Sequence, residues 1–116
     1  LDLFAGTGSI SYEFASRGVR SVTSVEINAV HHAFIRRTAQ ELGVRNLYAV
    51  KANAFLYLKS CTKQFDLIFS DAPYDLERSE EIVPLCWRVI CFVKGEFLFL
   101  STQKRKIFRN ILPFGN

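Results

Sequence analysis

The sequence has few of the residues that build disulfide or metal sites. Its three cysteines, Cys61, Cys86 and Cys91, form an odd set without a CxxC pair, and its two histidines, His31 and His32, are adjacent. These numbers and spacings argue against a disulfide framework and against a zinc site. We therefore expect buried thiols, helix-surface histidines without a catalytic role, no metal ion and a cytoplasmic protein.

Long apolar runs are also missing. No run approaches the ~18 residues that span a bilayer, and the start shows no basic segment followed by a plain apolar stretch. The sequence thus predicts no signal peptide and no contact with a membrane. It contains no methionine at all and begins inside an apolar run, which suggests a piece of a longer chain. With 116 residues, we expect one domain over 1–116, incomplete at both ends.

Acidic residues are fewer than basic ones, at 11 against 15. Three of the acids, Asp2, Glu26 and Asp71, are assigned below to a ligand pocket, so the remaining surface is more basic than the net charge of +4 indicates. A basic exterior suits a polyanionic partner such as RNA or DNA. A charge of this size also simply keeps a protein soluble, so charge alone does not identify the partner.

Strand-like and helix-like segments alternate along the chain. Apolar segments predict strands at 1–5, 21–27, 46–50, 65–70 and 96–101, and helical spacing predicts helices at 9–18, 29–42, 53–60 and 80–92. This alternation predicts an α/β fold, a doubly wound parallel sheet of about five strands with helices on both faces. Ligands of such sheets bind beyond the carboxyl ends of the strands, so the residues directly after each strand are the candidates for a site.

A glycine-rich loop, "AGTGS", comes after the first strand. Gly6 and Gly8 let the backbone approach a ligand closely, and the helix after them offers free N–H groups. The fingerprint GxGxxG is only partly met, because Ser11 stands where its third glycine belongs. The loop suits a nucleotide cofactor without selecting one.

Two polar residues come after the next two strands. Glu26 lies eighteen residues after Gly8, where a carboxylate can accept hydrogen bonds from both hydroxyls of an adenosine ribose. The alternative is an exposed acid at the end of a strand. Asn53 could meet an adenine edge, cap the following helix, or do both. Ile27 or Phe55 could pack on the adenine face. NAD-dependent and S-adenosylmethionine-dependent enzymes share these features, which therefore predict adenosine but not the reaction.

The segment "SDAPYD" comes after the fourth strand and indicates a chemistry. Asp71 and the carbonyl of Ala72 can accept the two hydrogens of a planar amine, Pro73 can stiffen the turn, and Tyr74 can stack an extruded base. The segment resembles the [DN]-P-P-[YF] signature of methyltransferases that modify such amines. The alternative is an ordinary Asp-Pro turn with a surface tyrosine, but the position after the fourth strand favours the functional interpretation.

Together, "DLFAGTGS", the glutamate after the second strand and "DAPY" resemble the bacterial small-subunit ribosomal RNA guanine-N2 methyltransferase family, over nearly all 116 residues. The resemblance implies a Rossmann-like class I methyltransferase core, S-adenosylmethionine as cofactor, and as substrate a guanine of 16S ribosomal RNA or of the assembling small ribosomal subunit. It assigns Asp71, Ala72, Pro73 and Tyr74 to the target base. It assigns to the cofactor Asp2, Phe4, Ala5, Gly6, Thr7, Gly8, Glu26, Ile27, Asn53, Ala54 and Phe55.

The chain departs from that family in four places. No segment precedes "LDLFAG", the chain stops at "LPFGN" where relatives continue into two more strands, Ala72 replaces a proline, and "FLST" stands where an acidic "EH" pair is common. Without the last strands, 96–101 should be an open apolar edge that pairs with another chain, giving a dimer. The basic segment 103–109 predicts either contacts with RNA phosphates or a solvated helix face.

Other functions stay open at this stage. An NAD-dependent dehydrogenase would explain the glycine loop and Glu26 but not "DAPY". A methyltransferase of another amine, in DNA adenine, another RNA or a small molecule, would share the same motifs. A truncated nucleotide-binding domain without activity would also carry them.

Overall fold

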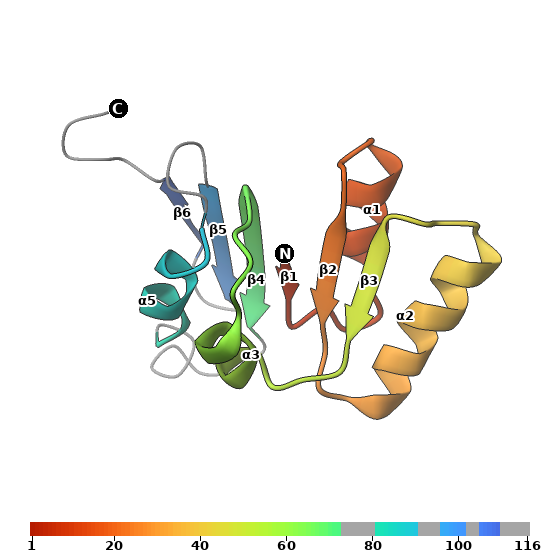
Figure 1. The fold of residues 1–116 in the computed structure, drawn as a ribbon, viewed down its shortest axis with the longest axis horizontal. Coiled ribbons are helices and arrows are strands. Elements are labelled where there is room, and N and C mark those ends of the chain that lie inside the picture. The colour runs from red at the N-terminus through yellow and green to blue at the C-terminus, as the bar shows by residue number, and fades with distance from the viewer. Residues whose placement is uncertain (73–80, 91–95, 102–104, 110–116) are drawn as a thin grey trace.

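The computed structural model describes residues 1–72, 81–90, 96–101 and 105–109, and its strands form one six-stranded sheet (Figure 1). The elements in chain order are β1 (Asp2–Leu3), α1 (Ser9–Ser16), β2 (Val22–Val25), α2 (Ala29–Glu41), β3 (Leu47–Val50), α3 (Ala54–Ser60), β4 (Leu67–Ala72), α5 (Ile82–Trp87), β5 (Glu96–Ser101) and β6 (Arg105–Arg109). The order across the sheet is β3-β2-β1-β4-β5-β6. Strands β1 to β5 are parallel, and β6 is antiparallel to β5. The predicted α/β fold is confirmed.

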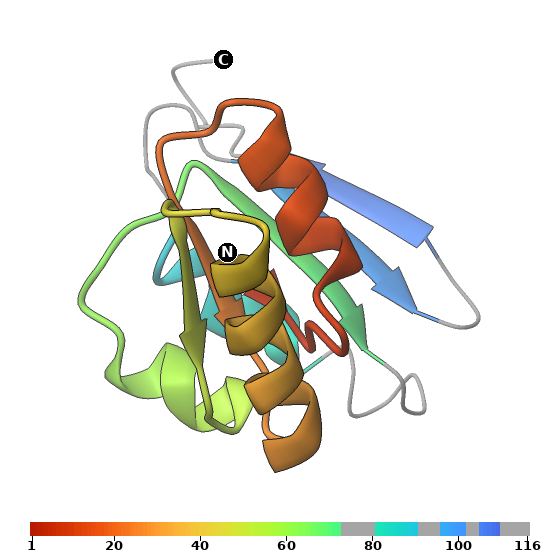
Figure 2. The same cartoon turned by 90° about the vertical axis from the view of Figure 1, so that its right-hand side faces the viewer.

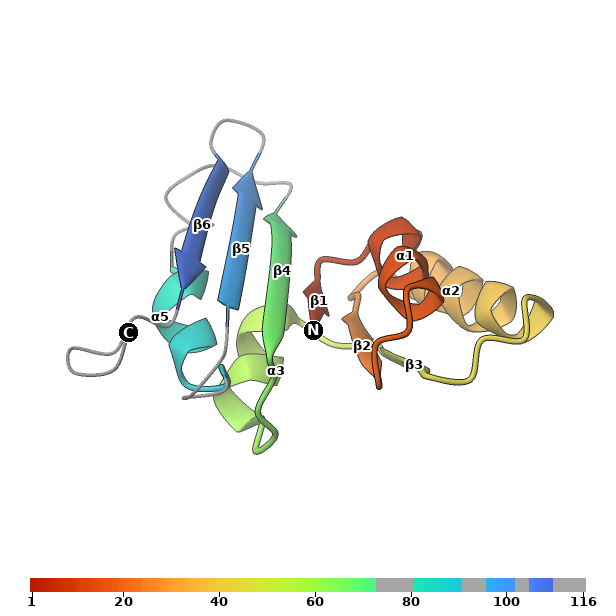
Figure 3. The same ribbon diagram turned by 90° about the horizontal axis from the view of Figure 1, so that it is seen from above.

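Helices cover both faces of the sheet. Figure 2 shows α1 and α2 in front of the sheet, while α3 and α5 pack against each other on its other side. The chain moves outward from β1 through β2 to β3 and then returns to place β4 on the other side of β1, which lies in the middle of the sheet (Figure 3). The winding therefore reverses between β1 and β4, and parallel sheets bind ligands beside such a reversal.

The larger hydrophobic core lies between the sheet and the pair α3 and α5. Leu3 and Ile68 come from the strands, Leu58 from α3, and Ile82 and Cys86 from α5, and all five side chains are fully buried. Burial of one such aliphatic side chain stabilises the fold by about 1.5–3 kcal/mol.

The cysteines and the membrane prediction can be compared with this packing. Cys86 is a buried thiol as expected, Cys61 is half-buried, and Cys91 lies outside the described residues. Among the residues that the structure describes, no helix is both long and apolar enough to cross a membrane.

All four helices are shorter than their patterns predict, α2 and α3 by one residue each and α1 and α5 by more. α1 ends at Ser16, because Gly18 adopts a left-handed φ of 87° that stops the helix. α5 spans only Ile82–Trp87, because the chain leaves the helix to form a parallel bridge between Ile90 and Phe65.

The prediction that 96–101 forms an open edge is wrong. β6 pairs with five of the six residues of β5, from Arg105 opposite Leu100 to Arg109 opposite Glu96. The prediction of a helix face for the basic segment is also wrong where the structure describes it, at 105–109. The basic residues of this segment did not indicate a strand, yet residues 105–109 form β6. Lysine and arginine are common on edge strands because they discourage pairing with other chains. The predicted dimer depended on an unpaired β5, so the structure no longer supports it.

The two glycines after β1 serve different geometric needs. Both have positive φ, 59° at Gly6 and 87° at Gly8. A Cβ at Gly6 would meet nothing within 4 Å, whereas one at Gly8 would lie 3.0 Å from Ile35 Cγ1 and 3.0 Å from Tyr12 Cζ. Gly8 therefore allows the start of α1 to approach α2 closely.

We expect Gly8→Ala to lower the free energy of unfolding more than Gly6→Ala. The left-handed φ penalises both substitutions by about 1–2 kcal/mol, and only the Gly8 variant must also displace Ile35 and Tyr12. Chemical denaturation of the two variants beside the parent chain measures the difference. Equal losses would show that the close approach of α1 to α2 does not depend on the missing side chain.

Candidate functional site

A cavity of about 570 Å³ opens where β1, β2 and β3 end and extends to the end of β4. Its lining combines residues of the loop after β1 with residues at or after the ends of β2, β3 and β4. The lining residues are Phe4, Gly6, Val25, Glu26, Ile27, Asn28, His31, Ala52, Asn53, Ala54, Phe55 and Asp71. The cavity thus lies at the carboxyl edge of the sheet, where the sequence predicts a ligand.

Glu26 ties two walls of this cavity together. Its Oε1 accepts a hydrogen bond of 2.7 Å from the Gly6 N–H, and its Oε2 accepts one of 2.9 Å from the Asn28 N–H. The residue is only 9% exposed, so the alternative of an exposed strand-end acid is wrong. Each carboxylate oxygen has a second lone pair, so Glu26 can also accept hydrogen bonds from a ligand in the cavity.

Two asparagines begin the helices that flank the cavity. Asn28 Oδ1 accepts from the N–H groups of Val30 and His31, at 2.9 and 3.0 Å, at the start of α2. Asn53 Oδ1 accepts from Phe55 and Leu56, at 2.9 and 3.2 Å, at the start of α3. Asn53 is therefore a helix cap, one of the two roles predicted for it.

The side chain of Asn53 retains capacity for a ligand. Its oxygen is used by the cap, and no acceptor within the described part of the chain is recorded for its NH₂ group. That group is available to donate a hydrogen bond into the cavity that Asn53 lines.

The apolar part of the cavity is built from aromatic and aliphatic side chains. The rings of Phe4 and Phe55 contact each other edge to face, with centroids 6.3 Å apart and planes at 71°. Phe4 has a left-handed φ of 57°, which costs about 1–3 kcal/mol for a residue other than glycine. Ile27 is 55% exposed beside them. Such surfaces suit a flat, weakly polar ring.

Asp71 overhangs the glycine loop because β1 is short. The last pair of the β1–β4 ladder joins Leu3 to Ser70, and β4 then continues through Asp71 and Ala72 beside β5 alone. Asp71 is exposed and lines the same cavity as Gly6. The structure therefore brings the loop after β1 and the end of β4 to one place.

Asp2 lies beneath the site instead of facing it. Its side chain is 1% exposed and does not line the cavity, and its Oδ2 accepts a hydrogen bond of 2.6 Å from the Ser11 hydroxyl. The Ser11 hydroxyl also contacts the hydroxyl of Ser24. Burial raises the pKa of Asp2 to about 6, even though the bond from Ser11 opposes the shift. Asp2 is thus placed to support the glycine loop and α1 from below.

The remaining predicted residues divide into two groups. Ala5, Thr7 and Gly8 form the compact turn under the cavity, in which the Gly8 N–H donates to the Ala5 carbonyl at 2.9 Å, but they do not line it. Ala72 ends β4, and Pro73 and Tyr74 lie outside the described residues.

Sequence reasoning missed some residues of the lining. His31, predicted to be a surface residue, is half-buried and lines the cavity from the first turn of α2, and Asn28 does so from the cap position. The signal for both was their place directly after a parallel strand. Within the described ranges, no group of three or more His, Cys, Asp or Glu residues could hold a metal ion.

Comparison with known proteins places this geometry in a family context. The family model described as "Conserved hypothetical protein 95" matches residues 1–113. "Ribosomal RNA small subunit methyltransferase D" of Buchnera aphidicola subsp. Baizongia pistaciae is 31% identical over all of the chain, and the chain covers 59% of that protein. "Ribosomal RNA large subunit methyltransferase K/L" of Shewanella oneidensis is 33% identical over 91% of the chain, which covers 17% of it. The resemblance to small-subunit ribosomal RNA methyltransferases is confirmed, and the chain spans less than two thirds of these relatives.

Solved structures share the fold at low sequence identity. HI0767 of Haemophilus influenzae, described as a candidate methylase, has a TM-score of 0.83 and 18% identity, covering 96% of this chain and 86% of that one. The ribosomal protein L11 methylase of Lactobacillus delbrueckii subsp. bulgaricus has a TM-score of 0.72 and 19% identity, covering 84% and 48%. These likenesses support the fold.

The raised pKa of Asp2 predicts a pH-dependent cost that Asp2→Asn should remove. The folded chain binds the Asp2 proton more tightly than the unfolded chain does, so the contribution of Asp2 to stability is full below about pH 4 and is lost as the pH rises through 6. The shift from 3.8 to about 6 corresponds to about 3 kcal/mol at neutral pH.

We expect Asp2→Asn to raise the melting temperature at pH 7.5 and to change it little at pH 4, as measured by thermal unfolding across this range. The exposed Glu41→Gln serves as control, because it removes a charge that is already solvated. A melting temperature lowered equally at both pH values would contradict this assignment of Asp2.

Proposed function

Because the chain belongs to the family described as conserved hypothetical protein 95, we propose that it carries the cofactor-binding and catalytic core of an S-adenosylmethionine-dependent methyltransferase. Its acceptor in this proposal is the 2-amino group of a guanine in 16S ribosomal RNA. The observation that carries the proposal is the presence of Asp71 and the Gly6–Glu26 pair in one cavity. The relatives named ribosomal RNA small subunit methyltransferase D support the choice of RNA.

The chemistry of the cavity lining fits the adenosine part of S-adenosylmethionine. Glu26 offers carboxylate oxygens to ribose hydroxyls, Asn53 offers an NH₂ group to an adenine nitrogen, and Ile27 and Phe55 offer apolar surface to its ring. A volume of about 570 Å³ is within the range of small-molecule pockets. When bound, this cofactor supplies an electrophilic methyl group, so the chain needs no nucleophile of its own.

The role of the protein is then to hold the acceptor amine. Asp71 accepts one of its N–H groups, and the Ala72 carbonyl accepts the other. Orientation of this kind can lower a barrier by about 7–11 kcal/mol. The Asp71 carboxylate also stabilises the positive charge that develops on the attacking nitrogen. Tyr74 and Pro73 keep the stacking and stiffening roles that the motif resemblance gives them.

The choice of guanine rests on the hydrogen-bonding capacity of Asp71. An ionised carboxylate only accepts hydrogen bonds, whereas an asparagine both donates and accepts. The Watson–Crick edge of guanine presents two adjacent donors, its N1–H and its 2-amino group, and a carboxylate matches both. Adenine presents one donor and one acceptor on that edge, which matches an amide instead. Asp71 therefore favours guanine over adenine.

A second acceptor RNA is worth testing because some relatives are named for the large ribosomal subunit and not for the small one. The Shewanella relatives are named ribosomal RNA large subunit methyltransferase K/L, and one of them is 33% identical to this chain. The assay that tests the proposal is transfer of labelled methyl groups by the full-length protein to 16S and 23S ribosomal RNA and to duplex DNA. Nucleoside digestion then identifies the product. N2-methylguanosine from 16S RNA supports the proposal, and label confined to DNA or 23S RNA contradicts it.

Glu26→Gln should weaken the binding of S-adenosylmethionine about tenfold or more. The amide would direct a donor at the N–H of Gly6 or of Asn28, and hydrogen bonds to a charged group contribute about 1.5–3 kcal/mol each. Calorimetric titration measures the change, with Glu41→Gln as the matched control on the exposed side of α2. An unchanged dissociation constant would remove Glu26 from the cofactor site.

Asp71→Asn should leave cofactor affinity within a few-fold and lower kcat about 10²–10³-fold. The substitution keeps the shape of the side chain, but its NH₂ group faces the guanine donors, and removal of one such electrostatic interaction has this order of effect. Single-turnover methyl transfer to 16S RNA, with the cofactor titrated in parallel, separates the two readouts. A variant that turns over at the parent rate would exclude Asp71 from catalysis.

A further inference from the structure

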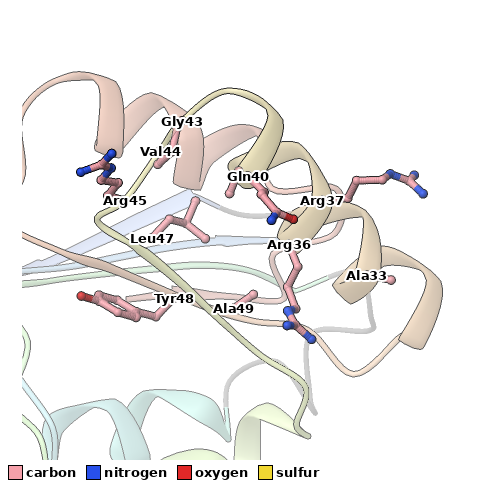
Figure 4. A pocket seen from close by; sticks show the side chains of 11 residues that line it. Ala33, Arg36, Arg37, Gln40, Gly43, Val44, Arg45, Leu47, Tyr48 and Ala49 are labelled. Atoms are coloured by element: carbon pink, nitrogen blue, oxygen red, sulfur yellow. The ribbon is translucent and has the colours of Figure 1, made fainter.

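A second, larger cavity of about 830 Å³ forms a groove between α2 and β3, outside the site described above (Figure 4). We propose that this groove, here called the basic groove, binds the phosphate backbone of the RNA whose base enters the catalytic cavity. Arg36, Arg37 and Gln40 of α2, Arg45 before β3, and Leu47 and Tyr48 of β3 line it. The inference deepens the proposed function and rests on it for the identity of the RNA.

The charge of the basic groove has one sign. Three arginines line it and no aspartate or glutamate does. All three arginines are exposed. Within the described part of the chain, none of them forms an ion pair, and the pair that is present joins Arg17 to Glu13 on α1. Arg37 lies 5.9 Å above the ring of Phe34, which steadies it without neutralising it. The groove therefore presents uncompensated positive charge to any anion that enters.

The arginines are spread along the groove and do not converge. In Figure 4, Arg45 lies at one end and Arg36 at the other, and Arg37 points outward from α2. The helix alone rises about 7.5 Å from Arg36 to its end at Glu41, and Arg45 lies beyond that end. A single phosphate ion could not contact the ends together, whereas a chain of phosphates can, so the spacing favours an extended polyanion.

The basic groove also leads to the catalytic cavity. α2 carries His31 on the cavity and Arg36 on the groove, about 7.5 Å further along the helix. β3 contributes Ala49 to the groove, and Ala52 and Asn53 after it line the cavity. A strand of RNA in the groove thus continues toward the pocket. Tyr48, 57% exposed, offers a ring on which an unpaired base can stack.

The alternative occupant is a second copy of the chain, because β3 is an edge strand. Two features oppose this occupant. His32 Nε2 lies 3.3 Å from the Ala49 carbonyl and so occupies an acceptor on that strand. A symmetric dimer through the groove would also place this positively charged surface of one copy against the same surface of the other. RNA, which carries the complementary charge, is therefore the occupant that we argue for.

The test compares two charge reversals in the full-length protein. Arg36→Glu with Arg45→Glu alters the groove, and Lys59→Glu with Lys63→Glu makes the same change of charge at exposed positions near and after the end of α3. The probes are a labelled 16S ribosomal RNA transcript and an RNA of unrelated sequence, titrated by fluorescence anisotropy at several salt concentrations. Calorimetry with S-adenosylmethionine and sedimentation of the free protein complete the set.

We expect the groove variant to bind both RNAs at least tenfold more weakly than the control variant. The slope of log affinity against log salt should fall by about 0.7 for each phosphate that the variant no longer neutralises, and the cofactor affinity should not change. Methyl transfer should recover at saturating RNA, because the catalytic cavity is intact.

The failures are distinguishable. If the parent protein methylates 16S RNA and the groove variant binds RNA like the control, the basic groove is not an RNA surface although the proposed function stands. If the parent methylates no RNA but the groove variant still loses RNA affinity, the groove inference stands and the proposed function fails. A parent dimer that the groove variant alone dissociates, with RNA affinity unchanged, would assign the groove to self-association and overturn the inference.

Discussion

The candidate site depends on one buried carboxylate that is shared by two backbone amides. Glu26 is nearly buried, and a buried charge is tolerated only where hydrogen bonds compensate it. The amides of Gly6 and Asn28 provide that compensation, one from the loop after β1 and the other from the start of α2. Gly6 has a left-handed φ, which would be unfavourable for a residue with a side chain. Glycine at this position therefore lets the backbone direct its N–H at the Glu26 carboxylate. Removing the carboxylate would leave both amides without this acceptor.

Much of this arrangement can be predicted from local rules. Alternating strands and helices fix the parallel sheet, and the sheet fixes the edge at which Glu26, Asn53 and Asp71 must emerge. Asparagine before a helix predicts a cap, and Asn53 makes one. Non-local facts are harder to predict. The position of Asp2 under the loop involves a hydrogen bond from Ser11, nine residues later in the chain. The pairing of β6 with β5 is likewise not specified by the residues of β5 alone.

The basic groove is a second feature that could not be predicted from the sequence. Arg36, Arg37 and Arg45 are ordinary in the sequence, where each reads as a solvated charge on or after a helix. They become one surface only because α2 lies over β3, which brings Arg45 and Arg36 to the two ends of a single groove. No periodicity along the chain encodes that juxtaposition, since it depends on which strand ends the sheet. The order of strands, and not their sequence, creates the patch.

The position of opposite charges along α2 gives the proposed RNA complex a direction. The candidate cavity at the start of α2 is lined by Glu26 and Asp71, and the basic groove farther along is lined by arginines. Carboxylates repel phosphates and arginines attract them, so under the proposal an RNA chain would bind with its backbone in the groove. The group that then reaches Asp71 must be uncharged and must carry N–H donors, and the edge of an extruded guanine meets both conditions. In the proposed complex, selection of the base would thus begin with electrostatic exclusion, before any contact with the base is made.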